Sequence, residues 1–217
     1  MNKNNGNSAI VVSRSIGIAF LVLYSLQLFA IIWLVWVYYD QRVLIGEQNR
    51  RIEELERKLK ILDIIEEYQI GFSDDEITTL ANVICDESER LGLDPLLVLA
   101  IILTESSFKR NQRSHMGAVG LMQVKPSIGQ DVADRWRIDW PSPEALKNPA
   151  LNVKIGTAYL FELILKFGDV KHAIIAYNLG ETVTREYQIY GVAPPARYYR
   201  KVRYNYLRLR RQFEVFN

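Results

Sequence analysis

The sequence predicts an all-α protein with three parts: a membrane-spanning helix, a short helical stalk and a helical globular domain. Three observations carry this prediction. Residues 16–39 contain no charged side chain. Residues 45–65 repeat apolar side chains in a heptad pattern. From Ser73 onward, apolar residues recur at helical spacing between helix start and stop signals, and no segment alternates as a strand would.

Composition narrows the class of protein only a little. The 217 residues are 49% hydrophobic, which is enough for a core, and the net charge of +2 averages over a basic C-terminal end. Cys85 is the single cysteine, so an intrachain disulfide is impossible, and its helical pattern predicts a small core residue. His115 and His172 stand apart from each other and from that cysteine. We therefore expect no metal site and no cofactor.

Residues 1–15 are polar and rich in asparagine, and we expect a flexible tail. Residues 16–39 are long enough to cross a bilayer of roughly 30 Å. Aromatic side chains gather at the far end of this stretch, as in an interfacial belt: Trp33, Trp36, Tyr38 and Tyr39. Because a cleaved signal peptide would be shorter and end in small residues, we predict a retained anchor. A very hydrophobic core helix is the alternative.

Residues 40–70 are predicted to form a helical stalk. Its heptad pattern places apolar side chains mainly at two core positions, occupied by Ile45, Ile52 and Leu59 and by Gln48, Leu55 and Leu62. About three heptads pair only marginally alone, but a shared membrane raises the effective concentration. The pattern thus predicts either a homodimer through residues 45–65 or a single amphipathic helix packed on the globular domain.

The globular domain is predicted to span residues 71–217. It opens with a capping box from Ser73 to Glu76, and this first helix should end near Gly92. Later helix starts are indicated by caps or prolines at Asp94-Pro95, Pro126, Asn148-Pro149, Asp169 and, for the last helix, about Pro195.

The helix that begins at Asp94-Pro95 carries the most informative residue of the domain. Residues 96–103 are apolar all round, which predicts a buried helix. Glu105 follows on the same face as Val98 and Ile102. Burial and the negative end of the helix dipole both favour the neutral carboxylic acid, as a general acid near neutral pH requires. The alternative is a solvated glutamate in the last turn.

Four motifs follow in order. They are E-S-x-F at residues 105–108, S-x-x-G-A-x-G-L-M-Q at 114–123, N-x-x-x-G-x-x-Y-L at 152–160 and A-Y-N-x-G at 176–180. Together they resemble the soluble-lytic-transglycosylase type of murein lytic transglycosylases, glycoside hydrolase family 23, which are related to goose-type lysozyme. The resemblance covers roughly residues 73–217 and implies a lysozyme-like helical catalytic domain.

The resemblance implies a peptidoglycan lytic transglycosylase with one catalytic carboxylate, Glu105. The glutamate would protonate the β-1,4 bond between N-acetylmuramic acid and N-acetylglucosamine, and would then accept the proton of the muramoyl C6 hydroxyl, giving a 1,6-anhydro sugar. A substrate acetamido group would replace the second acid that most glycosidases use. Asp94 lies roughly 16 Å away along the helix, too far to be that acid. Glu181 is the reserve candidate, with helix capping as its alternative role.

The same resemblance implies the substrate-binding residues: Ser106, Ser114, Gly117, Met122, Gln123, Tyr177, Asn178 and Tyr198. Met122 and Gln123 would form the floor of the cleft, and Tyr198 could stack on a sugar. The sequence departs from the family pattern at two places. Pro194-Pro195 replaces a Glu-Thr pair that precedes Tyr198, and Leu179 replaces a smaller residue, so the cleft should be narrower there.

Partners and location follow from these expectations. Basic residues flank both ends of the predicted anchor, so charge alone does not orient it. The implied substrate places the domain at the periplasmic, cell-wall side of the inner membrane. The last helix alternates tyrosine and basic residues, which we interpret as a solvated face that attracts anionic wall polymers or headgroups, not as a nucleic-acid site. Two alternatives to a transglycosylase are a hydrolytic muramidase and a wall-binding scaffold.

Overall fold

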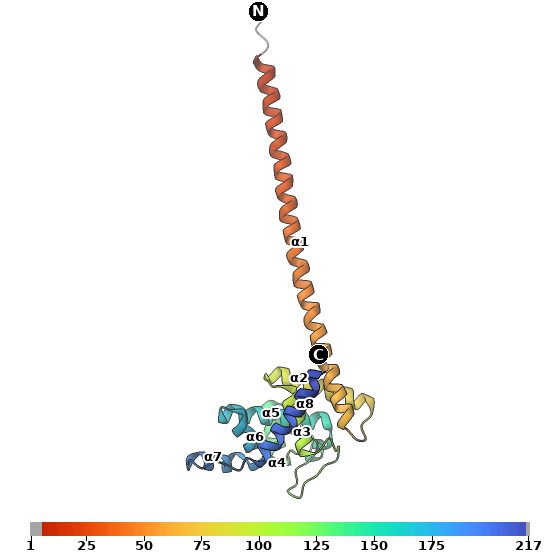
Figure 1. The fold of residues 1–217 in the computed structure, drawn as a ribbon, viewed down its shortest axis with the longest axis vertical. Helices are drawn as coiled ribbons and strands as arrows, with labels where there is room; N and C mark the ends of the chain where they lie inside the picture. Colours follow the sequence, from red (N-terminus) through yellow and green to blue (C-terminus); the bar gives the residue numbers. More distant parts are fainter. Residues whose placement is uncertain (1–5, 216–217) are drawn as a thin grey trace, which may run out of the picture. The chain divides into compact units, whose positions relative to one another are not determined.

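A computed structural model describes the backbone of residues 6–215 and the side chains of residues 14–214. Its elements are α1 (Gly6–Tyr68), α2 (Asp74–Leu91), α3 (Pro95–Glu105), α4 (Pro126–Trp136), the 3₁₀-helix η1 (Pro143–Lys147), α5 (Pro149–Phe167), α6 (Val170–Leu179), α7 (Glu181–Ile189) and α8 (Arg197–Val215). Within the described range, β structure is limited to isolated bridges. The predicted all-α class is confirmed (Figure 1).

The chain divides into two compact units, residues 1–55 and 56–217. The first unit is the greater part of α1, the one described helix that is long and apolar enough to cross a membrane. The flexible tail was expected over residues 1–15. Residues 1–5 lie outside the described range, and the rest of that stretch belongs to α1, which begins at Gly6. The heptad residues Ile45 and Ile52 are exposed, so the homodimer stays a prediction.

The second unit begins earlier than the predicted domain start at residue 71, because the last turns of α1 contribute to its core. Ile61, Ile64 and Ile65 are at most 2% exposed. They recur at i, i+3 and i+4, so they form one apolar face of the helix. The core positions predicted from the heptad pattern are other residues of the same helix. In this part of the predicted stalk, the helix packs on the globular domain.

Four predicted helix starts in the second unit are confirmed at their caps, and α8 begins at Arg197, two residues after the predicted Pro195. Ser73 and Glu76 form the capping box of α2, which ends at Gly92 in the left-handed conformation. Asp94 caps α3 by accepting a 2.8 Å hydrogen bond from the Leu96 amide. Asn148 and Asp169 cap α5 and α6 in the same manner. These caps fix where each helix starts.

α3 lies in the core of this unit and packs against α2 and α8. Val98, Ile101 and Ile102 are fully buried, as the apolar pattern predicted. α8, dark blue in Figure 1, brings Val202 and Leu209 into the same core. As a result, α8 lies against the helix that ends at Glu105.

Candidate active site

Glu105 is the last residue of α3, and its carboxyl group is half-buried. Burial raises the pKa of Glu105 above its ordinary value of 4.5, because desolvation penalises the charged form. One contact acts in the opposite direction: the Tyr198 hydroxyl donates a 2.6 Å hydrogen bond to Oε1 of Glu105 and lowers its pKa. Burial is the larger effect, so the group is shifted toward the protonated form.

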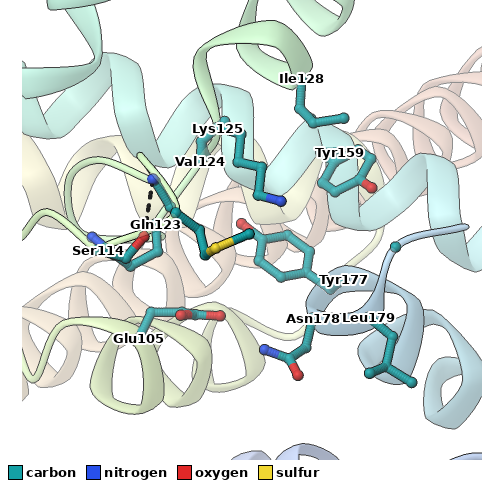
Figure 2. Close-up of a pocket in the computed structure, with 13 residues that line it drawn as sticks. Glu105, Ser114, Gln123, Val124, Lys125, Ile128, Tyr159, Tyr177, Asn178 and Leu179 are labelled. Carbon is teal, nitrogen blue, oxygen red and sulfur yellow. Dashed lines mark hydrogen bonds between the residues drawn. The ribbon is translucent and has the colours of Figure 1, made fainter.

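Glu105 lines a pocket of about 520 Å³. The other lining residues are Ser114, Met116, Ala118, Gln123, Val124, Lys125, Ile128, Tyr159, Tyr177, Asn178, Leu179 and Gly180. Figure 2 shows Glu105 from α3 facing the same space as Tyr177 from α6. Among the described residues that line the pocket, Glu105 is the one carboxylic acid.

The chain reverses direction immediately after Glu105. Ser106 ends α3, and its buried side chain donates to the carbonyl of Ile102 at 3.1 Å. Ser107 and Phe108 follow with positive φ angles of 52° and 58°, which are uncommon for residues with side chains. Phe108 is fully buried and anchors this turn. Ser106 is therefore a structural residue of the helix end, not a pocket-lining residue.

A second turn places Ser114 on the pocket wall. The Ser114 Oγ accepts a 3.0 Å hydrogen bond from the Ala118 amide, drawn as a dashed line in Figure 2. The Ser114 amide donates to the Ala118 carbonyl at 2.9 Å. Gly117 lies inside this turn with φ of 78°, a conformation that a side chain would strain. Gly117 thus shapes the turn and does not itself line the pocket.

A buried asparagine holds the remaining part of the loop. The Oδ1 of Asn152 accepts a 2.8 Å hydrogen bond from the Met122 amide, and its Nδ2 donates to the carbonyls of Val119 and Leu146 at 2.8 and 3.0 Å. The backbone of Gly120 lies so close to Asn152 that a Cβ at Gly120 would be 2.3 Å from the side-chain nitrogen Nδ2 of Asn152. The asparagine of one motif therefore positions the glycine-rich segment of another.

Met122 and Gln123 have different environments. The Met122 side chain is fully buried against Gly156, where an added Cβ would lie 2.6 Å from the Met122 sulfur. Gln123 lines the pocket, but its amide nitrogen donates to the carbonyls of Gln112 and Gly120 at 2.9 and 2.8 Å. Met122 thus packs behind the loop, and Gln123 both fastens the loop and presents its remaining surface to the pocket.

Two tyrosines form the opposite wall. The Tyr177 hydroxyl donates a 2.9 Å hydrogen bond to the Met122 carbonyl, which ties α6 to the loop. The rings of Tyr159 and Tyr177 lie 5.3 Å apart. Burial raises the pKa of Tyr159 to about 12 and that of Tyr177 well above 10, so both hydroxyls are neutral donors. Asn178 is exposed at the rim beside them.

The structure therefore brings together five of the predicted site residues as pocket lining: Glu105, Ser114, Gln123, Tyr177 and Asn178. Tyr198 joins them through its bond to Glu105. Lys125 and Tyr159 are among the lining residues that the prediction missed. Tyr159 belongs to the N-x-x-x-G-x-x-Y-L motif, so its motif position was a usable signal. Lys125 stands two residues after Gln123 and had no distinguishing signal.

The reserve acid Glu181 is engaged elsewhere. Its carboxylate pairs with Lys166 at 2.6 Å and with Arg185 at 3.0 Å. These bonds lower its pKa, so it is held as the anion. Glu181 does not line the pocket. Across the described residues, no group of three or more His, Cys, Asp or Glu side chains is arranged to hold a metal ion.

Comparison with known proteins agrees with this arrangement. Residues 82–194 match the family described as the transglycosylase SLT domain. The chain is 51% identical over 72 residues to the endo-type membrane-bound lytic murein transglycosylase A of Klebsiella pneumoniae, an alignment covering 32% of this chain and 35% of that one. It is 37% identical over 132 residues to the membrane-bound lytic murein transglycosylase C of Sodalis glossinidius, covering 52% and 37%.

Among solved structures, lytic transglycosylase Slt of Pseudomonas aeruginosa aligns with a TM-score of 0.46 at 30% identity, over 49% of this chain and 17% of that one. The alignments span between 21% and 37% of the length of these curated relatives. The family match, in contrast, covers more than half of the 217 residues and includes Glu105, the pocket loop and α6. The chain belongs to the transglycosylase SLT domain family.

Proposed function

We propose that the protein is a membrane-anchored peptidoglycan lytic transglycosylase in which Glu105 acts first as acid and then as base. The observation that carries the proposal is the half-buried Glu105, which is the one acid lining its pocket among the described residues and has a raised pKa. An acid near neutral pH must hold its proton until the transition state, and burial favours that form. The names of the aligned relatives support the substrate class.

The reaction would proceed in two steps. Glu105 donates its proton to the bridging oxygen as the bond from C1 of N-acetylmuramic acid breaks, and the N-acetylglucosamine product leaves with a hydroxyl. The substrate acetamido group supports the positive charge at C1, which dispenses with a second protein acid. The C6 hydroxyl then bonds to C1 and transfers its proton to Glu105. The glutamate is restored, and no water is consumed.

The neighbours of Glu105 suit these two roles. The Tyr198 hydroxyl donates to the carboxylate, so it stabilises the anion that exists between the steps. Ser114, Gln123 and Asn178 offer polar atoms to the sugar on the pocket wall, and Tyr159 and Tyr177 offer ring faces. Ser106, Gly117 and Met122 hold the loop in shape, so we assign them to positioning instead of direct sugar contact.

Mass spectrometry of digested peptidoglycan tests the proposal directly. Release of 1,6-anhydro-muropeptides supports a transglycosylase. Release of muropeptides with reducing ends would instead show a hydrolytic muramidase that uses the same glutamate with water. Absence of any cleavage would leave a wall-binding scaffold.

A matched pair of variants tests the role of Glu105. Because general acid–base catalysis contributes about 10²–10⁴-fold, Glu105→Gln should lower the cleavage rate by at least that factor. Glu181→Gln removes the other acid considered for the site, which is bound in ion pairs, and should cleave normally. If Glu105→Gln still cleaves glycan at the wild-type rate, Glu105 is not the acid.

We further propose that α1 anchors the chain in the inner membrane with the catalytic unit on the periplasmic side. The uncharged stretch 16–39 within α1 and the membrane-bound relatives support anchoring. Protease protection of intact spheroplasts tests the orientation, since external protease should remove the catalytic unit. Chemical cross-linking in membranes tests the homodimer through residues 45–65. Recovery of monomers alone would contradict the heptad pairing.

A further inference from the structure

A second pocket of about 520 Å³ lies where the end of α3 meets the first turns of α8. We call it the basic pocket. Its lining residues are Leu103, Thr104, Ser107, Arg197, Arg200, Lys201, Tyr204 and Asn205. It is built on residues adjacent in the chain to the proposed catalytic acid and to Tyr198, yet it shares no lining residue with the pocket that contains Glu105.

Three positive charges define the basic pocket. Arg197, Arg200 and Lys201 recur at i, i+3 and i+4, so they share one face of α8. Within residues 14–214, no carboxylate forms an ion pair with any of them, although Arg210 on the same helix pairs with Glu214 at 2.8 Å. Like charges at this spacing repel one another. A bound anion would remove that repulsion.

The side chains beside the cations are held in fixed positions. Asn205 donates a 2.9 Å hydrogen bond to the Thr104 hydroxyl, which itself donates to the Ala100 carbonyl at 2.7 Å. Ser107 donates to the Leu103 carbonyl at 3.3 Å. The bond from Asn205 ties α8 to the end of α3, and the other two bonds hold the side chains of Thr104 and Ser107 against α3 itself. The cations therefore stand on a well-defined support next to the proposed catalytic centre.

The cations do not serve to tune the proposed acid. The pKa of Glu105 is set by its burial and by Tyr198, and no basic side chain contributes to the shift. A role for the cations must lie in what they bind. Arginine matches a carboxylate in two parallel hydrogen bonds, and three cations on one face suit a ligand with more than one carboxylate.

We propose that the basic pocket binds carboxylates of the peptide stems that peptidoglycan carries on its muramic acid residues. This assignment rests on the proposed function, because it takes the ligand to be part of the glycan cleaved at Glu105. An extended peptide spans about 3.3–3.6 Å per residue, so three residues cover roughly the 10 Å diameter of one helix. The proposal therefore takes the basic pocket to lie within that reach of the scissile bond.

The first test is a binding measurement on the full chain in detergent, with Glu105→Gln to prevent turnover. The probes are a fluorescently labelled N-acetylglucosaminyl-N-acetylmuramyl tripeptide and the same disaccharide without peptide. Arg200→Gln/Lys201→Gln should weaken binding of the peptide-bearing probe by at least about 10-fold, since the loss of a single charged hydrogen bond already corresponds to that factor, and should leave binding of the other probe unchanged. Lys171→Gln/Arg211→Gln, which removes equal charge from exposed positions outside the pocket, should bind both as the parent does.

The second test compares cleavage of intact glycan and of glycan stripped of its peptides by an amidase. With Glu105 intact, the chain that carries Arg200→Gln/Lys201→Gln should cleave intact glycan with a raised KM and stripped glycan normally. If the wild-type chain cleaves neither glycan, the proposed function fails, and the binding measurement still decides whether the basic pocket binds the peptide. Equal binding of the peptide-bearing probe by pocket and control variants overturns the assignment. The assignment is also overturned if the pocket substitutions weaken binding only to phosphatidylglycerol vesicles, because that result would assign the pocket to lipid headgroups.

Discussion

Replacing Asn152 by alanine should destabilise the catalytic unit far more than the same change at a neighbouring asparagine. Asn152 is fully buried and makes three hydrogen bonds, to the Met122 amide and to the carbonyls of Val119 and Leu146. Each lost bond to a carbonyl costs about 1 kcal/mol, and the buried Met122 amide left without its acceptor costs a further 1–3 kcal/mol. The sum is about 3–5 kcal/mol.

The matched control is Asn148→Ala on the first turn of the same helix. Asn148 is exposed and accepts one hydrogen bond from the Leu151 amide as the cap of α5. Losing such a cap costs about 1 kcal/mol. For a domain of this size each kcal/mol lowers the Tm by about 2–4 °C, so Asn152→Ala should lower it by roughly 6–20 °C and Asn148→Ala by a few degrees.

Thermal unfolding of the full chain in detergent, followed by circular dichroism, measures the difference. Asn152→Asp adds a sharper test, because it keeps an acceptor for the Met122 amide but sets a carboxylate against two carbonyl oxygens. Its pKa in the folded state should be raised, so the variant should gain stability as the pH falls and the acid becomes a donor. The reasoning is refuted if Asn152→Ala loses no more than Asn148→Ala.

Three further predictions follow from the site. Because burial raises the pKa of Glu105, the stability linked to its protonation is present below pH 4.5 and lost as the pH rises through the raised value. Glu105→Gln should therefore have a higher Tm than the wild type at neutral pH and an equal one below pH 4.5; an equal Tm throughout would contradict it. Tyr198→Phe removes the donor that lowers the pKa of Glu105, so the basic limb of the kcat/KM profile should move to higher pH, and a limb that stays in place would show that the bond is unimportant. Gly156→Ala places a Cβ 2.6 Å from the Met122 sulfur and should cost about 1–3 kcal/mol in chemical denaturation, whereas Gly46→Ala, in helical open space, should cost nothing.

Much of the fold was predictable because its signals are local. Helix starts depend on a cap and the next three residues, so Ser73 and Asp94 were recognised from sequence alone. The start of the second compact unit was not predictable in this way, because the packing of Ile64 and Ile65 depends on helices far along the chain. Their apolar face competes with the heptad pattern in the same helix, and periodicity alone does not say which face is covered.

The same distinction between local signals and long-range packing applies to the candidate site. Glu105 was predictable because its burial follows from the apolar helix before it. The environment of Met122 was not, because a motif position does not reveal whether a side chain faces the pocket or packs behind it. The structure also shows why Asn152 and Gly120 depend on each other, since the side-chain amide of Asn152 fills the space that a side chain at position 120 would need.

The bond between Tyr198 and Glu105 links the chemistry of the site to the docking of α8. α8 reaches α3 at three places: Tyr198 bonds Glu105, Asn205 bonds Thr104, and Tyr206 donates to Asp94 at 2.7 Å. Val202 and Leu209 are buried beneath the same helix. If α8 left this position, Glu105 would lose both its cover and its donor, and water would return its pKa toward the ordinary value. A docked C-terminal helix is therefore a condition for the raised pKa of the proposed acid.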